Sequence, residues 1–195
     1  MAAKSFRDLA GIPPSTPKTT DSVLLIIDAQ NEYAEGALAV SNLATSRPAV
    51  ERLVKRYRAA GGAVAHIKHI VPSGTPVFTP GTPLAEEFSE LGPLPAGGKE
   101  FVVEKRFPGS FTETTLQGAI EATGLRKLVL VGYMAHVCVS TTAREAHQRG
   151  YEVVIAEDAI GDRDIPGASG QEVSKMVLLE LADFFATIVK SDDIN

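Results

Sequence analysis

The sequence predicts an α/β protein with a three-layer α/β/α, doubly wound fold, built on a six-stranded parallel sheet in the order 3-2-1-4-5-6. Short apolar runs without polar alternation recur along the chain, as is typical of strands that are buried on both faces of a sheet. Segments in which apolar residues follow helical spacing separate most of these runs. Strands that alternate with helices pair in parallel, with helices on both faces of the sheet.

Each predicted strand is a short apolar run bounded by charged, polar or glycine residues. The first run ends at Asp28 and the third at Lys105, while Gly132 follows the fourth. Charged residues at the carboxyl ends of parallel strands lie where open α/β sheets bind ligands. The predicted strands are 22–28, 63–70, 101–105, 128–131, 152–156 and 187–190.

The predicted helices are bounded by capping residues and by glycines. Ser46 is expected to cap the first helix and Thr112 the second, and Gly124 and Gly150 are expected to end the second and third. An acidic turn at 157–158 is expected after the fifth strand. The predicted helices span 47–60, 112–122, 139–150 and 171–184.

Two segments stand apart from these elements. Residues 1–20 are rich in proline and threonine and are expected to form a surface arm in front of a single domain, 21–195. Residues 71–98 form a long loop rich in proline and glycine, with at most one short helix near 84–89. Loops of this length in compact domains are often functional, so Phe78 is a candidate cover for a pocket.

The composition argues against several classes of function. The chain has 195 residues, is 44% hydrophobic and contains no apolar run near ~18 residues, so no membrane span is expected. A formal charge of -5 without a long basic cluster argues against nucleic acid and anionic membranes as partners. One cysteine indicates a reducing, cytoplasmic setting, and 1–20 lacks the apolar core of a secretory signal. The expected partner is a small-molecule substrate.

Cys138, the only cysteine, lies where the pattern changes from strand to helix. A thiol at the start of a helix faces unpaired backbone N–H groups and the positive end of the helix dipole, and both stabilise a thiolate. A strand, a turn and a helix with a nucleophile at the helix start is also how many esterases and amidases expose their attacking atom. Cys138 is therefore a candidate nucleophile.

Asp28, Lys105 and Cys138 follow the first, third and fourth predicted strands and should share one rim of the sheet. Taken alone, Asp28 is equally well explained as a cap of a helix or turn. Near a thiol, however, a carboxylate can accept its proton, and an ammonium group favours the anionic forms of both. The three residues could therefore attack an electron-poor carbonyl or amide carbon.

These residues resemble the isochorismatase-like cysteine hydrolases, a family that includes nicotinamidases, N-carbamoylsarcosine amidases and ureidoacrylate amidohydrolases. The resemblance covers the chain from Leu24 to about Val189 and implies a hydrolase that needs no cofactor and assembles as a dimer or tetramer. It rests on the segments 24–30, 104–111 with 115–116, 131–144 and 150–159, which occur in the order and spacing of the family.

The resemblance implies a role for each site residue. Cys138 would be the nucleophile that forms a thioester acyl-enzyme, Asp28 the general base and Lys105 the cation that tunes both. The peptide bond between Tyr133 and Met134 would be cis, and the backbone N–H groups of Met134 and Cys138 would form an oxyanion hole.

The sequence departs from the nicotinamidase pattern after the second strand, where those enzymes carry an Asp-x-His metal site. His66 and His69 are three residues apart on a strand and point to opposite faces, so no metal site is expected. His69 is expected to line the substrate pocket and His66 to lie in the core. Aromatic residues are the other candidates for the pocket, although each one taken singly is better explained as an ordinary core residue: Tyr33, Phe78, Phe107, Phe111 and Tyr133.

Some isochorismatases in the family lack the cysteine, because protonation of a vinyl ether needs an acid and not a nucleophile. The presence of Cys138 therefore favours hydrolysis of a C–N bond of an amide or ureide as the expected function. One alternative is isochorismatase-type hydrolysis of a vinyl ether with Asp28 and Lys105. Another is a redox or binding module in which Cys138 turns over no substrate, and a further one is that Cys138 is only a small buried residue. His136, two residues before the cysteine, departs from several amidases and leaves the substrate open.

Overall fold

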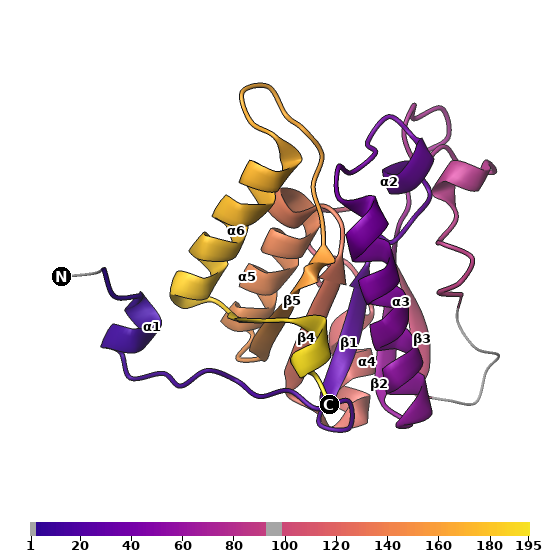
Figure 1. Cartoon of the computed structure of the whole chain (residues 1–195). Coiled ribbons are helices and arrows are strands. Elements are labelled where there is room, and N and C mark those ends of the chain that lie inside the picture. Colours follow the sequence, from indigo (N-terminus) through magenta and orange to yellow (C-terminus); the bar gives the residue numbers. More distant parts are fainter. Residues whose placement is uncertain (1–2, 93–98) are drawn as a thin grey trace.

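The structure, a computed structural model, describes residues 3–92 and 99–195. Figure 1 shows one sheet with helices on both sides. Its six strands pair in parallel in the order β3-β2-β1-β4-β5-β6, so the predicted fold class and strand order are confirmed. The strands are β1 Ser22–Ile27, β2 Ala63–His69, β3 Glu100–Lys105, β4 Lys127–Gly132, β5 Glu152–Ile160 and β6 Thr187–Val189.

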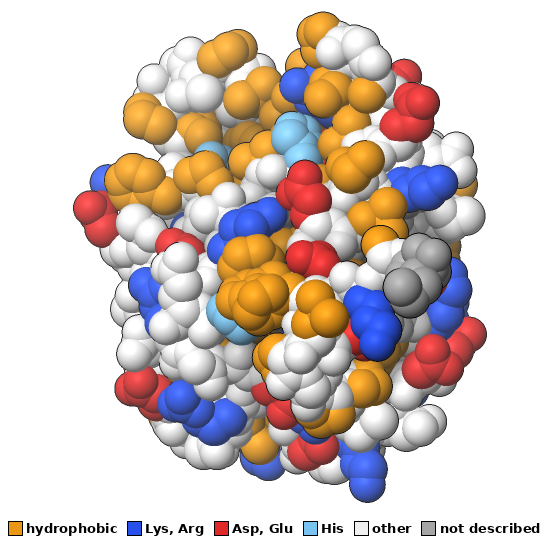
Figure 2. Space-filling view, turned by 90° about the vertical axis from the view of Figure 1, so that its left-hand side faces the viewer, with side chains coloured by type: hydrophobic (Ala, Val, Ile, Leu, Met, Phe, Trp, Pro, Cys, Tyr) orange, Lys and Arg blue, Asp and Glu red, His pale blue; other side chains and the backbone are white. Residues whose placement is uncertain are grey.

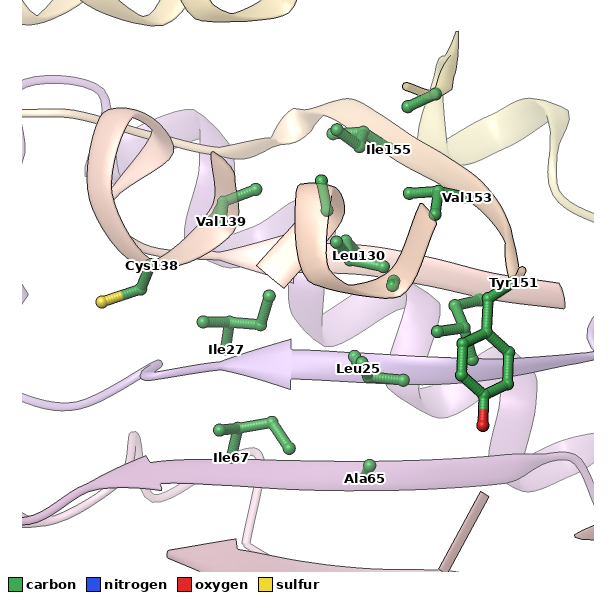
Figure 3. Close-up of a cluster of buried hydrophobic side chains, with 14 of the residues drawn as sticks. Leu25, Ile27, Ala65, Ile67, Leu130, Cys138, Val139, Tyr151, Val153 and Ile155 are labelled. Atoms are coloured by element: carbon green, nitrogen blue, oxygen red, sulfur yellow. The ribbon is translucent and has the colours of Figure 1, made fainter. Parts of the chain in front are cut away.

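Two hydrophobic clusters cover the two faces of the sheet. Successive residues of a strand point to opposite faces, and β1 is fully buried on both: Leu25 and Ile27 join one cluster, while Leu24 and Ile26 join the other. Figure 3 shows the first cluster, in which α5 packs over β1 and β4. The helices are α1 Phe6–Leu9, α2 Glu32–Glu35, α3 Leu43–Ala59, α4 Leu116–Thr123, α5 Ser140–Gln148 and α6 Gly170–Phe184.

Helices α4, α5 and α6 cover the first face of the sheet, and α3 covers the second. Helix α3 begins four residues earlier than predicted, so Ser46 lies inside it and donates a hydrogen bond to the carbonyl oxygen of Asn42 at 3.1 Å instead of capping it. Helix α4 begins four residues later than predicted. Thr112 does not cap it, because its hydroxyl donates to the carboxylate of Glu145 in α5.

Strand β5 is longer than predicted and continues through the expected acidic turn to Ile160. Its pairing with β4 shifts register between Leu130 and Gly132, which allows Gly132 to pair with Ile160. The carboxylate of Asp158 accepts hydrogen bonds from the backbone and the hydroxyl of Ser191, at 2.7 and 2.6 Å. These bonds satisfy the Asp158 carboxylate inside the strand. The sequence predicts a turn there, because acidic residues are more usual in turns than in strands.

The two segments outside the predicted elements also carry local structure. In the arm, α1 lies against α6, where the rings of Phe6 and Phe184 are 4.8 Å apart; residues 1–2 lie outside the described part. In the 71–98 loop the expected helix near 84–89 is only a 3-10 turn, η1 Pro83–Ala85, and residues 93–98 lie outside the described part. Across the described residues, no helix has the length and apolar character needed to cross a membrane.

Candidate active site

The carboxyl ends of β1, β3 and β4 bring the three predicted catalytic residues together. Asp28 directly follows β1, Lys105 ends β3, and the turn that carries Cys138 follows β4. The loops after β1, β2 and β5 rise above this rim at the top of Figure 1. Figure 2 shows the top of the molecule hollowed between two raised groups of side chains, many of them hydrophobic.

A close approach between β1 and β4 sets the position of Asp28. Gly132 has a φ of 109°, and a Cβ atom there would collide with the carbonyl oxygen of Ile27, so only glycine fits. The next N–H, that of Tyr133, donates to the same carbonyl oxygen at 2.9 Å. Asp28 itself has a φ of 49°, in the left-handed region that aspartate tolerates better than most residues. This backbone turns the carboxylate out of the strand and over the rim.

Lys105 reaches Asp28 across β2, which lies between their strands. Neighbouring strands are about 4.8 Å apart, so a side chain on β3 must extend past a whole strand to reach β1. The ammonium nitrogen Nζ of Lys105 lies 2.7 Å from Oδ2 of Asp28, and both side chains are fully buried. It also donates to the carbonyl oxygen of Phe107 at 3.1 Å and to Nδ1 of His69 at 3.3 Å. Lysine is long enough to make all of these contacts.

The ammonium group of Lys105 keeps its charge chiefly because of the Asp28 carboxylate. Burial lowers the pKa of its ammonium group, but the attraction of Asp28 and of Cys138 outweighs burial and raises the pKa above its ordinary value. Burial and the neighbouring Lys105 instead lower the pKa of His69, against the opposing effect of Asp28. His69 is therefore a neutral acceptor beside a permanent cation.

Cys138 lies in a π-helical turn, η2 Ala135–Val139, and not at the first residue of an α-helix as predicted. Figure 3 shows its sulfur pointing away from the apolar cluster, beyond the end of β1. The sulfur lies 3.4 Å from Nζ of Lys105, the same ammonium group that is paired with Asp28.

The expectation that this position stabilises a thiolate is wrong for the resting site. Burial first, and then the Asp28 carboxylate, raise the pKa of the Cys138 thiol far above its ordinary value, and Lys105 only partly opposes them. The site therefore rests as a buried thiol beside a carboxylate.

The peptide bond between Tyr133 and Met134 is cis, at the place that the resemblance implies. The N–H groups on either side of Met134 have partners: that of Tyr133 is bonded to β1, and that of Ala135 donates to the carbonyl oxygen of Gly161 at 2.9 Å. The N–H of Met134 donates to no acceptor in the described part of the chain. This N–H is therefore available to a ligand.

The model of the isochorismatase domain family matches residues 22–193. The chain belongs to the isochorismatase family. It is 56% identical over 191 residues to the secreted isochorismatase effector Isc1 of Verticillium dahliae, with 98% of this chain and 99% of that protein covered. It is 28% identical over 190 residues to nicotinamidase 3 of Arabidopsis thaliana, with 92% and 89% covered.

Among solved structures, an isochorismatase from Pseudomonas putida KT2440 superimposes with a TM-score of 0.92 at 30% identity, and each chain is covered completely. The predicted resemblance is thereby confirmed, and so is the prediction that the protein is an enzyme, a hydrolase of the isochorismatase family.

In this isochorismatase-family protein, some aromatic candidates lie near the three predicted catalytic residues. The ring of Phe78 is 5.1 Å from that of His69, and the two line a cavity of about 180 Å³ with part of the 71–98 loop. The ring of Tyr33 lies 5.2 Å from Phe78 and 5.7 Å from Tyr133. These four side chains form a continuous aromatic group beside the rim.

Two other candidates for the pocket lie elsewhere. Phe107 is 42% exposed, and its carbonyl oxygen accepts a hydrogen bond from Lys105. Phe111 is a core residue: its ring stacks on Tyr151, with centroids 5.7 Å apart, and Figure 3 shows Tyr151 at the end of the cluster away from Cys138. A cavity of about 820 Å³ beside α6 contains none of the three catalytic candidates.

His66 and His69 do not converge on one point. His66 is buried, as expected, but it bridges two carboxylates: Nδ1 lies 2.7 Å from Glu87 and Nε2 lies 2.7 Å from Glu100. His69 faces Lys105 instead. Within the described residues, no group of three or more histidine, cysteine, aspartate or glutamate side chains is arranged to hold a metal ion.

One further residue at the site, Asp162, was not found from the sequence. Asp162, fully buried after β5, accepts hydrogen bonds from the backbone N–H and from Nδ1 of His136 at 2.9 and 2.7 Å. It thereby holds the turn that contains Cys138. The sequence does contain an indication of this role, because Asp162 is an acidic residue that follows the fifth strand, beyond the acidic pair 157–158. The predicted strand ends at 156, which is too early to place Asp162 at the rim.

Proposed function

We propose that this protein hydrolyses isochorismate, or a close enol-ether relative of it, at the site formed by Asp28, Lys105 and Cys138. The observation that carries the proposal is the 56% identity, over nearly the full length of both chains, to a protein named as an isochorismatase effector. The expectation of C–N hydrolysis, which rested on the presence of Cys138, becomes the second candidate.

The site holds the groups that enol-ether hydrolysis requires. Asp28, carrying a proton from the thiol or from solvent, protonates the terminal carbon of the double bond and leaves an oxocarbenium ion. Lys105, 2.7 Å away, stabilises the carboxylate that remains. Water adds to the cation and returns a proton to Asp28, and the resulting hemiketal separates into an alcohol and a keto acid. In this reaction the thiol is dispensable.

The second candidate is hydrolysis of an amide or ureide through Cys138, favoured by Lys105, whose ammonium group contacts both the sulfur and the Asp28 carboxylate. Asp28 takes the thiol proton, the sulfur attacks the carbonyl carbon, and the N–H of Met134 receives the developing oxyanion. The nitrogen leaves with the proton from Asp28, and water then releases the acid from the thioester. The identity to a protein named nicotinamidase supports this reading.

Three variants separate the two reactions. Pyruvate release from isochorismate, and ammonia release from nicotinamide, other amides and ureides, are measured for the unchanged protein and for Cys138→Ala, Asp28→Asn and Lys105→Met. For an isochorismatase, Cys138→Ala keeps most of the pyruvate release, while Asp28→Asn loses it. For a C–N hydrolase, Cys138→Ala loses nearly all ammonia release, and intact-mass analysis shows an acyl adduct that requires Cys138.

Two results would end these proposals. If no substrate in the panel is turned over while Cys138 oxidises reversibly, the site is a redox or binding module. If isochorismate is cleaved equally by Asp28→Asn, the acid lies elsewhere and the first mechanism is wrong. Folding of each variant is checked by its thermal transition.

Location and assembly belong to the same proposal. The cytoplasmic location predicted from the single cysteine competes with the secretion that the name of the Verticillium dahliae relative states. Immunoblotting of culture medium and cell lysate from the source organism decides between them. A dimer or tetramer, as the family resemblance implies, is tested by light scattering of the purified protein.

A further inference from the structure

The cysteine turn, Ala135–Val139, begins without a cap from the residue that precedes it. The first N–H groups of a helical turn have no partner inside the turn and need acceptors from elsewhere. Met134, directly before the turn, makes no side-chain capping bond. The N–H of Ala135 donates instead to the carbonyl oxygen of Gly161, and that of His136 to Oδ2 of Asp162, each at 2.9 Å. A carboxylate that comes 26 residues later in the chain than His136 therefore caps this turn.

The side chain of His136 makes a second bond to the same oxygen. Its Nδ1 lies 2.7 Å from Oδ2 of Asp162, and because a carboxylate accepts, Nδ1 is the donor. Residues two apart in a helical turn do not share a face. Here the sulfur of Cys138 faces Lys105 at 3.4 Å, while the ring of His136 faces Asp162. His136 therefore holds the turn from a side other than that of the sulfur.

Asp162 is itself fixed in place. Its side chain is fully buried, and Oδ1 accepts a hydrogen bond from the N–H of Arg163 at 2.9 Å. Its backbone carbonyl oxygen accepts bonds from the N–H and the hydroxyl group of Ser41, at 2.9 and 3.1 Å. The side-chain amide of Asn42 donates to the carbonyl oxygen of Ile160 at 2.9 Å. Displacing the segment would leave these polar groups unpaired, which costs free energy, so Asp162 is a firm anchor for the turn.

Lys105 is held by a different set of contacts. Its ammonium group is paired with Asp28 at 2.7 Å and donates to the carbonyl oxygen of Phe107 at 3.1 Å. The contact between the sulfur and Nζ therefore joins two parts of the site that have separate anchors. A shift of the cysteine turn by about 1 Å would break it, because hydrogen bonds weaken steeply with distance.

We propose that Asp162 is a positioning residue for Cys138: through the backbone and the ring of His136, it holds the cysteine turn where the sulfur meets Lys105. His136 then has no part in choosing the substrate. The proposal deepens the second candidate function and rests on it for any effect on turnover. The position of the sulfur is measured without a substrate, so a failure of this proposal is distinguishable from a failure of the function.

The test compares Asp162→Ala with a matched control, Asp158→Ala. Asp158 also follows the apolar part of β5 and accepts two hydrogen bonds, but both come from Ser191. The distance between Sγ of Cys138 and Nζ of Lys105 is measured in crystal structures of both variants. We expect Asp162→Ala to lengthen it beyond hydrogen-bond distance and Asp158→Ala to leave it near 3.4 Å. An unchanged distance in Asp162→Ala overturns the proposal.

A second pair of variants separates the two ring nitrogens of His136. Asparagine at this position places its amide nitrogen close to where Nδ1 lies and has no counterpart of Nε2, whereas alanine removes both. His136→Ala should lengthen the distance between the sulfur and Nζ, and His136→Asn should restore it. This pair leaves Asp162 unchanged, so it decides the question even where Asp162→Ala does not fold. If His136→Ala keeps the original distance, the ring bond does not hold the turn and the proposal is wrong.

Amide turnover, where the substrate panel shows it, adds a kinetic test. A misplacement of about 1 Å in a catalytic group can cost about a hundredfold in rate, so Asp162→Ala should lower kcat about tenfold to a hundredfold with little change in KM. His136→Asn should keep kcat. A raised KM with unchanged kcat in both His136 variants would place Nε2 on the substrate and contradict the proposal. If no amide is turned over, the second candidate function fails, and the measured distances still decide whether Asp162 holds the turn.

Discussion

Lys105 and Asp28 form an ion pair across an intervening strand: Nζ lies 2.7 Å from Oδ2, and neither side chain is exposed. Two charges without access to water depend on each other, because either one left alone would be buried and uncompensated. The same ammonium group contacts the sulfur of Cys138 at 3.4 Å. The Lys105 side chain therefore affects both the stability of the fold and the reactivity of the thiol.

The first prediction concerns the stability that this pair maintains. Lys105→Met keeps the length of the side chain and removes its charge, so Asp28 is left buried without its cation. The free energy of unfolding in urea is expected to fall by about 3–5 kcal/mol. Lys68→Met is the control, because Lys68 pairs at 2.9 Å with Glu86, which is largely exposed, and should cost about 0–1 kcal/mol. If the two variants lose equal unfolding free energy, the buried charges of Asp28 and Lys105 do not depend on each other for stability.

The second prediction concerns the reactivity of the thiol. Asp28 raises the pKa of Cys138 and Lys105 lowers it. Asp28→Asn should therefore speed alkylation by iodoacetamide at pH 7.5, and Lys105→Met should slow it. A change of one pKa unit alters the thiolate fraction about tenfold, so each effect should reach at least about that size. In the unchanged protein the rate should still rise with pH at pH 9, and a plateau near neutral pH would show that the thiol is not held protonated.

Much of the catalytic rim follows from local sequence patterns. Asp28 and Lys105 each end an apolar run, and Cys138 comes shortly after one, so a parallel sheet must place all three at its carboxyl edge. The strand order then decides their distances. It could be predicted because in a doubly wound sheet the fourth strand pairs with the first, at the point where the strand order reverses.

The parts that could not be predicted depend on contacts between distant segments. The protonation of Cys138 follows from how deeply the surrounding loops bury it, and no spacing in the sequence records burial. The role of Asp162 depends on the extension of β5, which needs Ser191 to satisfy Asp158. Phe111 was misplaced because an aromatic residue after a strand can turn either into the site or into the core.

The third prediction concerns His66 and the dependence of stability on pH. Burial lowers the pKa of His66, but hydrogen bonds and charges from Glu87 and Glu100 outweigh it and raise the pKa above its ordinary value; Glu100 is paired in turn with Arg58. The folded state therefore holds the proton more tightly than the unfolded state. This stabilisation is complete below the unfolded-state pKa of about 6.5 and is lost as pH rises through the higher folded-state pKa.

The unfolding free energy should accordingly decline between pH 6 and pH 9, and His66→Gln should remove that part of the decline. At pH 6 the substitution should cost about 1–3 kcal/mol, because it leaves buried carboxylate oxygens with weaker partners. Glu87→Gln removes one carboxylate from the pair and should flatten the same slope partly. If both variants retain the full slope, the decline comes from other groups.

The fourth prediction concerns Gly132, which brings β4 against β1 beside Asp28. Gly132→Ala should destabilise the protein by about 3 kcal/mol or more, because it combines a φ of 109° with a collision against the backbone of Ile27. Gly118→Ala is the control: Gly118 lies in α4, and a Cβ atom there meets nothing within 4 Å, so the change should stabilise by about 0.5–1 kcal/mol. Thermal unfolding and alkylation of Cys138 are measured on both variants. A Gly132→Ala protein of normal stability would mean that the two strands can separate locally, and the distance between Asp28 and the cysteine turn would then not be set by this contact.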